Sequence, residues 1–281
     1  AMMLAAKSRG KAVVIGGGLL GLEAAAGLKE QGMDVTVVHL MPTLMERQLD
    51  PAAGYLLAEA VKARGIKVMT GANTKAIHGD TRVTGVELAD GTVLPADMVV
   101  MAVGIRPNAA LAKDAALACN RGIVVDAQMR TSDPAIFALG ECVEVDGQVF
   151  GLVAPLYDMA NVLAATLAGR QSEFVPVATA TRLKVTGINL YSAGDFGEGD
   201  DREEIVLRDA TAGVYKRLIL KDDRIIGTVL YGDTADGPWF FDMLKRDVDT
   251  REMRDTLIFG QNYQGGAQLD PTAAVAALPD E

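Results

Sequence analysis

The first seventy residues alternate short apolar runs with segments of helical periodicity. Residues 11–15 (KAVVI) are an apolar run rich in β-branched side chains, which predicts a buried strand. Residues 19–32 place apolar side chains at helical spacing and stop at Gly32, which predicts a helix. The same alternation then predicts a strand, a helix and a strand, at residues 34–40, 50–65 and 66–71. This βαβαβ order implies a parallel sheet with right-handed crossovers.

The second predicted helix also carries chemical boundary signals. Asp50 is suited to its N-cap, Pro51 to its first helical position, and Gly65 stands at its end. Local chemistry and hydrophobic period therefore predict the same helix.

Beyond residue 73, three strand-like segments follow one another without helices, at residues 74–80, 82–91 and 92–104. Between the last two, the Asp90-Gly91 pair is a strong hairpin signal. A β-meander inserted into a βαβ unit, returning to a buried strand at residues 98–104, is a more specific pattern than βαβ alone.

The remaining chain contains a smaller unit and a third region of different texture. In the smaller unit, residues 122–126 and 135–140 are predicted strands, and residues 155–169 are a predicted helix. The third region carries a strand, a hairpin that turns near Asp222-Asp223, and a helix, at residues 203–209, 214–233 and 238–247. Its pattern is that of a small α+β domain.

Charge and cysteine content exclude several function classes. The formal net charge of −10 over 281 residues opposes binding to nucleic acid or to an anionic membrane surface. There is no stretch of about twenty apolar residues that could span a membrane. Two cysteines and two histidines leave little material for a metal site or a Ser-His-Asp triad. We expect free thiols in a reducing cytoplasm and no metal ligands.

The segment VVIGGGLLGLE fits G-x-G-x-x-G, between a predicted strand and a predicted helix. Gly16 would allow a tight turn, Gly18 a close approach of a pyrophosphate to the backbone, and Gly21 close packing of helix on strand. Leu19 and Leu20 begin the helix, whose N-terminal N–H groups and dipole would face the phosphates.

The residue that would read the ribose of a bound dinucleotide is less regular. An NAD site usually has an acidic residue at the end of the second strand, and this sequence has His39 there. His39 either contacts the ribose or a 2′-phosphate, or caps the strand. NAD and NADP both stay open, with NAD favoured because no basic cluster follows.

Two later apolar runs each end in a glycine. Residues 102–108 (AVGIRPN) place Gly104 at the end of the strand predicted to return to the sheet. The run at residues 135–140 ends in Gly140, which is followed by Glu141. A carboxylate beside a glycine at a strand end can accept hydrogen bonds from a ribityl chain.

The order of these segments resembles that of pyridine-nucleotide-dependent flavoprotein reductases with two dinucleotide-binding domains. In that family they would be the NAD(P)H fingerprint, the end of the NAD domain and the distal FAD motif, at residues 13–23, 102–108 and 131–142. The resemblance covers about residues 8–170. It implies that Glu141 binds the ribityl chain of FAD and that Glu23 lies near the nicotinamide and the flavin.

Four further segments look like the large subunit of NAD(P)H-dependent assimilatory nitrite reductases, at residues 44–50, 151–164, 181–196 and 254–261. That resemblance implies that a hydride passes from NAD(P)H to FAD. Electrons would then pass to iron–sulfur centres and a sirohaem, where nitrite becomes ammonium.

Compared with that family, this sequence lacks the first half of the FAD domain and the cysteine-rich modules, so we interpret it as an internal fragment. We expect an α/β fold with a Rossmann-like NAD(P)-binding domain and inserted β-meander, a partial FAD domain, a small α+β domain and a mobile tail, at residues 1–120, 121–172, 173–262 and 263–281. FAD would bind this chain poorly or not at all. The iron–sulfur cluster and the sirohaem would lie outside this chain. No catalytic side chain is assigned within the chain.

The apolar faces of residues 121–170 would lack the sheet on which they pack in the family. They would be covered by the remaining domains of the parent reductase, be mobile, or pair in a homodimer.

Two other functions stay open. One is a ferredoxin- or rubredoxin-type reductase of the same superfamily. The other is a non-catalytic nucleotide-binding module, against which the retained Gly140-Glu141 pair speaks.

Overall fold

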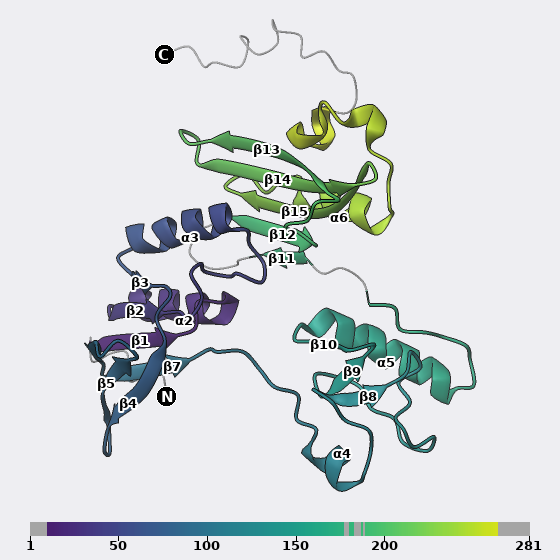
Figure 1. Ribbon diagram of the computed structural model, residues 1–281, viewed down its shortest axis with the longest axis horizontal. Helices are drawn as coiled ribbons and strands as arrows, with labels where there is room; N and C mark the ends of the chain where they lie inside the picture. The colour runs from purple at the N-terminus through teal and green to yellow at the C-terminus, as the bar shows by residue number, and fades with distance from the viewer. Residues whose placement is uncertain (1–9, 177–179, 183–186, 188, 264–281) are drawn as a thin grey trace, which may run out of the picture. The chain divides into compact units, whose positions relative to one another are not determined.

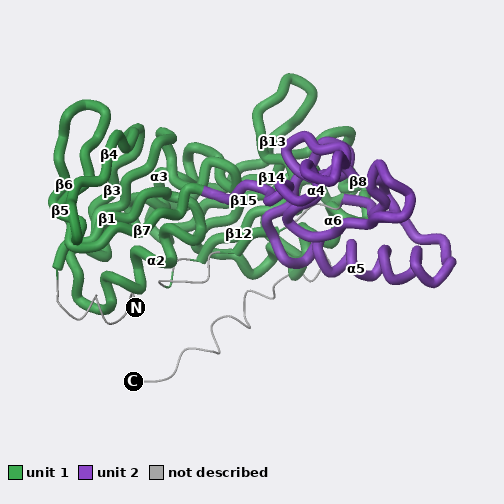
Figure 2. The backbone as a smooth tube through the Cα atoms, turned by 90° about the horizontal axis from the view of Figure 1, so that it is seen from below, with its two compact units in different colours: residues 1–103, 178–281 green, residues 104–177 purple. Residues whose placement is uncertain are grey.

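The structure is a computed structural model that describes residues 10–176, 180–182, 187 and 189–263. Its chain forms two compact units, residues 1–103 with 178–281, and residues 104–177 (Figure 2). These units group the chain differently from the predicted domains, whose bounds stay a prediction. Most of the tail predicted over 263–281 lies outside the described residues.

The first unit begins with a four-stranded parallel sheet in the order β3-β2-β1-β7 (Figure 1). Its strands are β1 (Lys11–Ile15), β2 (Asp34–Val38), β3 (Lys67–Met69) and β7 (Met98–Met101). Its helices are α2 (Leu19–Glu30) and α3 (Pro51–Ala63). The predicted βαβαβ order is confirmed. Asp50 is the N-cap of α3, and its side chain accepts a hydrogen bond from the Ala53 N–H at 3.0 Å.

Successive side chains of β1 enter two different apolar clusters, as the two-residue period of a strand requires. Ala12 and Val14 pack with residues of α2 and α3. Val13 and Ile15 pack with residues of the meander. Both faces of this strand are therefore covered, which explains why its sequence is an unbroken apolar run.

The predicted meander is confirmed as a three-stranded antiparallel sheet, β4-β5-β6. Its strands are β4 (Thr74–Gly79), β5 (Val83–Leu88) and β6 (Val93–Pro95). The segment 92–104, which reads as one strand, divides into β6 on the meander and β7 on the parallel sheet. The divide follows Pro95, which has no N–H to extend a ladder. The return strand β7 is also only partly buried, rather than buried as predicted.

The C-terminal part of the first unit is a five-stranded antiparallel sheet in the order β11-β12-β15-β14-β13. Its strands are β11 (Ala180–Arg182), β12 (Leu190–Gly194), β13 (Glu203–Asp209), β14 (Val214–Lys221) and β15 (Arg224–Tyr231). It is followed by α6 (Gly237–Lys245) and the short 3₁₀ helices η1 (Arg251–Met253), η2 (Leu257–Phe259) and η3 (Gln261–Tyr263). The predicted hairpin turns at Asp222 and Asp223, both with positive φ.

A buried polar cluster joins this sheet to α3 within the first unit. The second carboxylate oxygen of Asp50 accepts hydrogen bonds from the Tyr215 hydroxyl and, at 3.3 Å, from Arg217. Arg217 also pairs with Glu204 and donates to the Phe196 carbonyl at 3.1 Å. Burial and the neighbouring Asp50 carboxylate raise the pKa of the Tyr215 hydroxyl. The N-cap of α3 is thus also the anchor of the C-terminal sheet.

The second unit contains α4 (Ala110–Asp114), β8 (Ile123–Val125), β9 (Val143–Val145), β10 (Gln148–Val149) and α5 (Val153–Leu167). Its sheet has the order β10-β9-β8, and its core includes Val143, Met159 and Phe174. The described residues contain no helix with the length and apolar character needed to cross a membrane.

The prediction of a strand at residues 135–140 is wrong, since this segment makes only an isolated bridge between Phe137 and Arg130. Its start is consumed by a turn: the Ile136 N–H donates to the Asp133 carbonyl at 3.0 Å, and the Ala135 N–H donates to the Asp133 carboxylate at 2.8 Å. Backbone groups used in a turn cannot enter a ladder.

Candidate functional site

The loop after β1, called here the glycine loop (residues 16–18), and the first turn of α2 contain glycines at which contacts leave no room for a side chain. Gly16 has φ +116°, and a Cβ there would lie 2.2 Å from the Ala102 carbonyl oxygen at the end of β7. A Cβ on Gly21 would lie 2.0 Å from the Gly16 carbonyl oxygen. Both positions therefore need glycine for the packing of strand, loop and helix, as the motif predicts.

Gly18 differs, because no atom lies within 4 Å of the position its Cβ would take. Its backbone is extended (φ −82°, ψ −179°), a conformation open to any residue, so no strain explains the glycine. Gly18 is the N-cap of α2, and no side chain caps that helix end. Leu19 and Leu20 follow it, and Leu20 is 69% exposed. The N-terminus of α2 thus has no side-chain cap and has open space beside Gly18, and uncapped N–H groups at a helix N-terminus are suited to bind phosphate.

Gly17, the unassigned middle residue of the motif, is also required by packing. A Cβ there would lie 2.5 Å from the Leu44 side chain and 2.8 Å from the His39 ring. The Gly17 N–H donates to Nδ1 of His39 at 3.0 Å, and its carbonyl accepts from the Met45 N–H at 3.1 Å. The run of three glycines, Gly16-Gly17-Gly18, is the one sequence signal that another segment of the chain packs closely against this loop.

His39 is buried at the end of β2, where the sequence left its role open. Its Nε2 lies 2.9 Å from a carboxylate oxygen of Glu46. Because the Gly17 N–H is a donor, Nδ1 of His39 must accept. Nε2 therefore carries the ring hydrogen and donates a hydrogen bond to the Glu46 carboxylate. Both ring nitrogens of His39 are therefore engaged within the protein. No periodic signal in the sequence indicates that Glu46 pairs with His39.

The remaining predicted residues divide between the two units. Glu23 lies on α2, half-buried, in the first unit. Gly104, Gly140 and Glu141 belong to the second unit. Gly104 does not end β7 as predicted, since that strand stops at Met101. Gly140 has φ +104° and open space around its Cβ position, and Glu141 is exposed.

One carboxylate of the second unit is structural. Glu144 on β9 is buried and accepts hydrogen bonds from the Asn120 side chain at 3.2 Å and from the N–H groups of Arg121 and Gly122. These hydrogen bonds, led by that of Asn120, lower the pKa of Glu144. The Asp146-Gly147 turn signal could have revealed the hairpin that carries it, which the sequence analysis missed.

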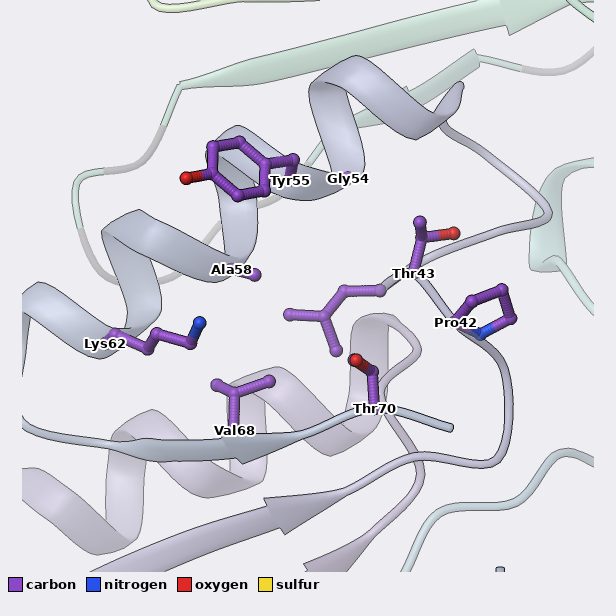
Figure 3. Close-up of a pocket in the computed structure, with 9 residues that line it drawn as sticks. Pro42, Thr43, Gly54, Tyr55, Ala58, Lys62, Val68 and Thr70 are labelled. Carbon is purple, nitrogen blue, oxygen red and sulfur yellow. The ribbon is translucent and has the colours of Figure 1, made fainter. Parts of the chain in front are cut away.

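A small hollow of about 120 Å³ lies between α3 and β3, next to residues 42–44 (Figure 3). Thr43, Tyr55, Lys62 and Thr70 are among its lining residues. Because pockets for drug-sized ligands are about 300–1,000 Å³, this hollow does not hold a dinucleotide. Among the described residues, no group of three or more His, Cys, Asp or Glu side chains is arranged to hold a metal ion.

Two family profiles match the chain in succession. The profile of pyridine nucleotide-disulphide oxidoreductases matches residues 2–180, and that of the rubredoxin NAD+ reductase C-terminal domain matches residues 180–248. The chain belongs to the pyridine nucleotide-disulphide oxidoreductase family. The predicted fold class is confirmed with it.

Within the family, nitrite reductases are among the similar proteins. The nitrite reductase [NAD(P)H] of Bacillus subtilis is 44% identical over 281 residues, 100% of this chain and 34% of that protein. The nitrite reductase (NADH) large subunit of Escherichia coli is 36% identical over 277 residues, 96% of this chain and 32% of that protein. The predicted resemblance is confirmed, and the chain spans about a third of the length of these relatives.

Solved structures of the family show the same fold. A ferredoxin reductase from Rhodopseudomonas palustris is 28% identical with a TM-score of 0.79, covering 91% of this chain and 65% of that one. The NADH:rubredoxin oxidoreductase from Clostridium acetobutylicum is 27% identical with a TM-score of 0.69, covering 86% and 60%.

Proposed function

We propose that this chain is the NAD(P)H-binding portion, with part of the FAD site, of a nitrite reductase. It would pass a hydride from NAD(P)H to FAD, for the reduction of nitrite to ammonium by the longer protein. The similarity to nitrite reductases supports the reaction, and the contrast at the glycine loop is the observation that carries the proposed nucleotide binding. At Gly16 and Gly21 the protein's own backbone occupies the space that a side chain would need, whereas at Gly18, at a helix N-terminus, that space is open.

The first unit supplies the nucleotide-binding groups. The N–H groups at Gly18, Leu19 and Leu20 would donate to the pyrophosphate, and the positive end of the α2 dipole would favour its charge. A side chain at Gly18 would occupy the space of the phosphate, so glycine there keeps the approach short. Glu23, on the same helix, is the residue that we propose lies nearest the nicotinamide, on the basis of the family resemblance.

The second unit fits one edge of a flavin site. Gly140 leaves open space where a Cβ would stand, and the carboxylate of Glu141 is exposed beside it. We propose that Glu141 accepts hydrogen bonds from the ribityl hydroxyls of FAD. When bound, FAD would supply the hydride acceptor and the route to one-electron carriers.

The iron–sulfur centres and sirohaem of the proposed parent reductase do not fit this chain. A four-cysteine cluster needs more than Cys119 and Cys142, the two cysteines of the sequence. We therefore propose that other parts of the longer protein hold these groups.

Exposed apolar side chains of the second unit support a further partner. Ile136, Leu139, Val153 and Tyr157 are exposed, and Tyr157 is 70% exposed. We propose that the remaining domains of the parent reductase cover this surface, with a homodimer as the alternative. We also propose a cytoplasmic location, where NADH or NADPH is supplied and thiols stay reduced.

A rubredoxin-type reductase is the second candidate function. The matching C-terminal profile favours it, and so does a rubredoxin-NAD(+) reductase from Alcanivorax borkumensis that is 42% identical over 165 residues. That similarity covers 57% of this chain, whereas the Bacillus subtilis nitrite reductase matches 100%, so nitrite reductase is the better-supported proposal.

Two binding measurements on the 281-residue chain test the proposal. Titration with NADH and with NADPH, followed by dihydronicotinamide fluorescence, should show saturable binding near one nucleotide per chain. Absence of binding by both would contradict the proposed function. Incubation with FAD followed by desalting should leave little flavin absorption, because the described residues offer one edge of that site. Retention near one FAD per chain would show that the site is completed by this chain or by a second copy of it.

A further inference from the structure

The turn after β2 holds one carboxylate next to a residue that is hydrogen-bonded to the glycine loop. The Met45 N–H donates to the Gly17 carbonyl at 3.1 Å, and the side chains of Leu44 and Met45 are almost fully buried. Met45 also has φ 52°, a turn conformation that carries the chain back across the loop. The backbone at Glu46 is therefore fixed relative to Gly17 by a direct hydrogen bond one residue away.

The side chain of Glu46 is fixed as well, through His39. His39 donates from Nε2 to Oε2 of Glu46 at 2.9 Å, and its Nδ1 is occupied by the Gly17 N–H. His39 accordingly offers no free ring nitrogen to a ligand. The Glu46 side chain is 28% exposed, and within the described residues no hydrogen bond reaches its other oxygen, Oε1. One charged acceptor oxygen is thus held ready beside the glycine loop.

This position is where a dinucleotide-binding domain needs an acidic group. The adenosine ribose lies by the carboxyl end of the second strand, next to the phosphate-binding loop. In this chain the residue directly after that strand is His39, which cannot act as an anionic acceptor, and Glu46, seven residues further on, lies within hydrogen-bond distance of it. The acid that the sequence lacks at the strand end is supplied by the turn.

We propose that Glu46 accepts a hydrogen bond from the 2′-hydroxyl of the adenosine ribose, with His39 as its positioning residue, and that the pair makes the site prefer NADH. This inference rests on the proposed NAD(P)H-binding function. A 2′-phosphate would meet the Glu46 carboxylate as a like charge, which disfavours NADPH. Arg47, the next residue, is exposed and is the competing reader that would favour the phosphate.

The test compares dissociation constants for NADH and NADPH, measured by dihydronicotinamide fluorescence on the 281-residue chain. Glu46→Gln keeps the shape of the side chain and removes its charge. The preference for NADH should fall at least about tenfold, the effect of losing one charge-assisted hydrogen bond. Glu59→Gln is the matched control, because Glu59 is an exposed acid paired with Lys62 on α3, and the preference should stay unchanged.

His39→Ala distinguishes positioning from a general structural role. Loss of structure lowers the affinity for both nucleotides, whereas loss of positioning lowers the preference between them. The double variant His39→Ala with Glu46→Gln should have the preference of Glu46→Gln alone, because His39 acts through Glu46.

Three results would overturn the inference. The first is an unchanged preference in Glu46→Gln. The second is tighter binding of NADPH than NADH that disappears in Arg47→Ala, which would assign recognition to Arg47. The third is binding of neither nucleotide by the unaltered chain, which would overturn the proposed function as well. The first two leave the proposed function standing, so the failures are distinguishable.

Discussion

The glycine loop of the first unit and the Gly140-Glu141 loop of the second unit are built to different degrees by the chain's own atoms. At the first loop and the adjoining turn of α2, a Cβ at Gly16, Gly17 or Gly21 would collide with the protein, whereas the Cβ position of Gly18 is open. At Gly140 nothing lies within 4 Å, and only its positive φ calls for glycine. The conformation of the first loop is therefore fixed by contacts within the protein, and open space remains only at Gly18. The second loop has open space at its glycine and no such contacts among the described residues.

The same contrast extends to what surrounds each loop. The helix that follows β2 is tied to the C-terminal sheet through buried Asp50, Tyr215 and Arg217. In the second unit, apolar side chains such as Leu139 and Tyr157 remain exposed. In a glycine-rich loop, a glycine that neither packing nor backbone conformation requires is thus a candidate position for ligand contact.

The largest effect is expected at the buried anchor of the first unit. Asp50→Ala should destabilise this unit by about 3–5 kcal/mol, because it leaves the Arg217 charge buried with one partner fewer and removes the N-cap of α3. Asp34→Ala removes an exposed pair with Lys67 and should cost about 0–1 kcal/mol. Chemical denaturation measures both, and equal effects would refute the anchor.

Two glycines of α2 should respond to alanine in opposite directions. Gly21→Ala should destabilise the first unit by about 1–3 kcal/mol, because the new Cβ would meet the Gly16 carbonyl oxygen. Gly27→Ala has open space around it and should stabilise the helix by about 0.5–1 kcal/mol. Thermal unfolding of the two variants measures the difference, and a shift of the same sign in both would contradict the packing described for Gly21.

In the second unit, Gly140→Ala should cost about 1–2 kcal/mol, because its φ of +104° disfavours an L-residue although space is available. Hydrogen exchange resolved by peptide should show faster exchange in residues 104–177 and none of the change in the first unit. Faster exchange around Gly16 would mean that the two loops are not independent.

The smallest effect is a pH dependence at Glu204. Its hydrogen bond from Arg217 lowers its pKa below the ordinary value of 4.5. A depressed pKa contributes stability above the unfolded-state pKa and loses it as pH falls through the folded-state value. Acidification below about pH 4.5 should therefore weaken the first unit, by less than about 1 kcal/mol for this half-exposed group. Glu204→Gln should remove that part of the acid dependence, and an unchanged acid profile would refute the assignment.

Local signals were sufficient for most of the fold. The apolar period predicted β1, α2, β2 and α3, and Asp50-Pro51 predicted where α3 begins, because these signals act between neighbours in sequence. The strand prediction for residues 135–140 failed, because an apolar run does not show that backbone groups of this segment are hydrogen-bonded to the side chains of Thr131 and Asp133.

The site was predictable in part for the same reason. Gly16, Gly18 and Gly21 follow from a fixed local spacing. The roles of His39 and Glu46 depend on a turn that returns to Gly17, and no period in the sequence encodes that return. The second role of Asp50, as partner of Tyr215 and Arg217, likewise joins residues far apart in sequence.

The most direct test of the glycine loop as a nucleotide frame is Gly18→Val, measured for NADH affinity and for unfolding free energy. Because the Cβ position is open and the backbone is extended, we predict that stability changes by no more than about 1 kcal/mol. NADH binding should fall at least about tenfold, since the side chain would fill the space of the pyrophosphate. Unchanged NADH affinity in a folded Gly18→Val chain would contradict the assignment of this loop to the nucleotide.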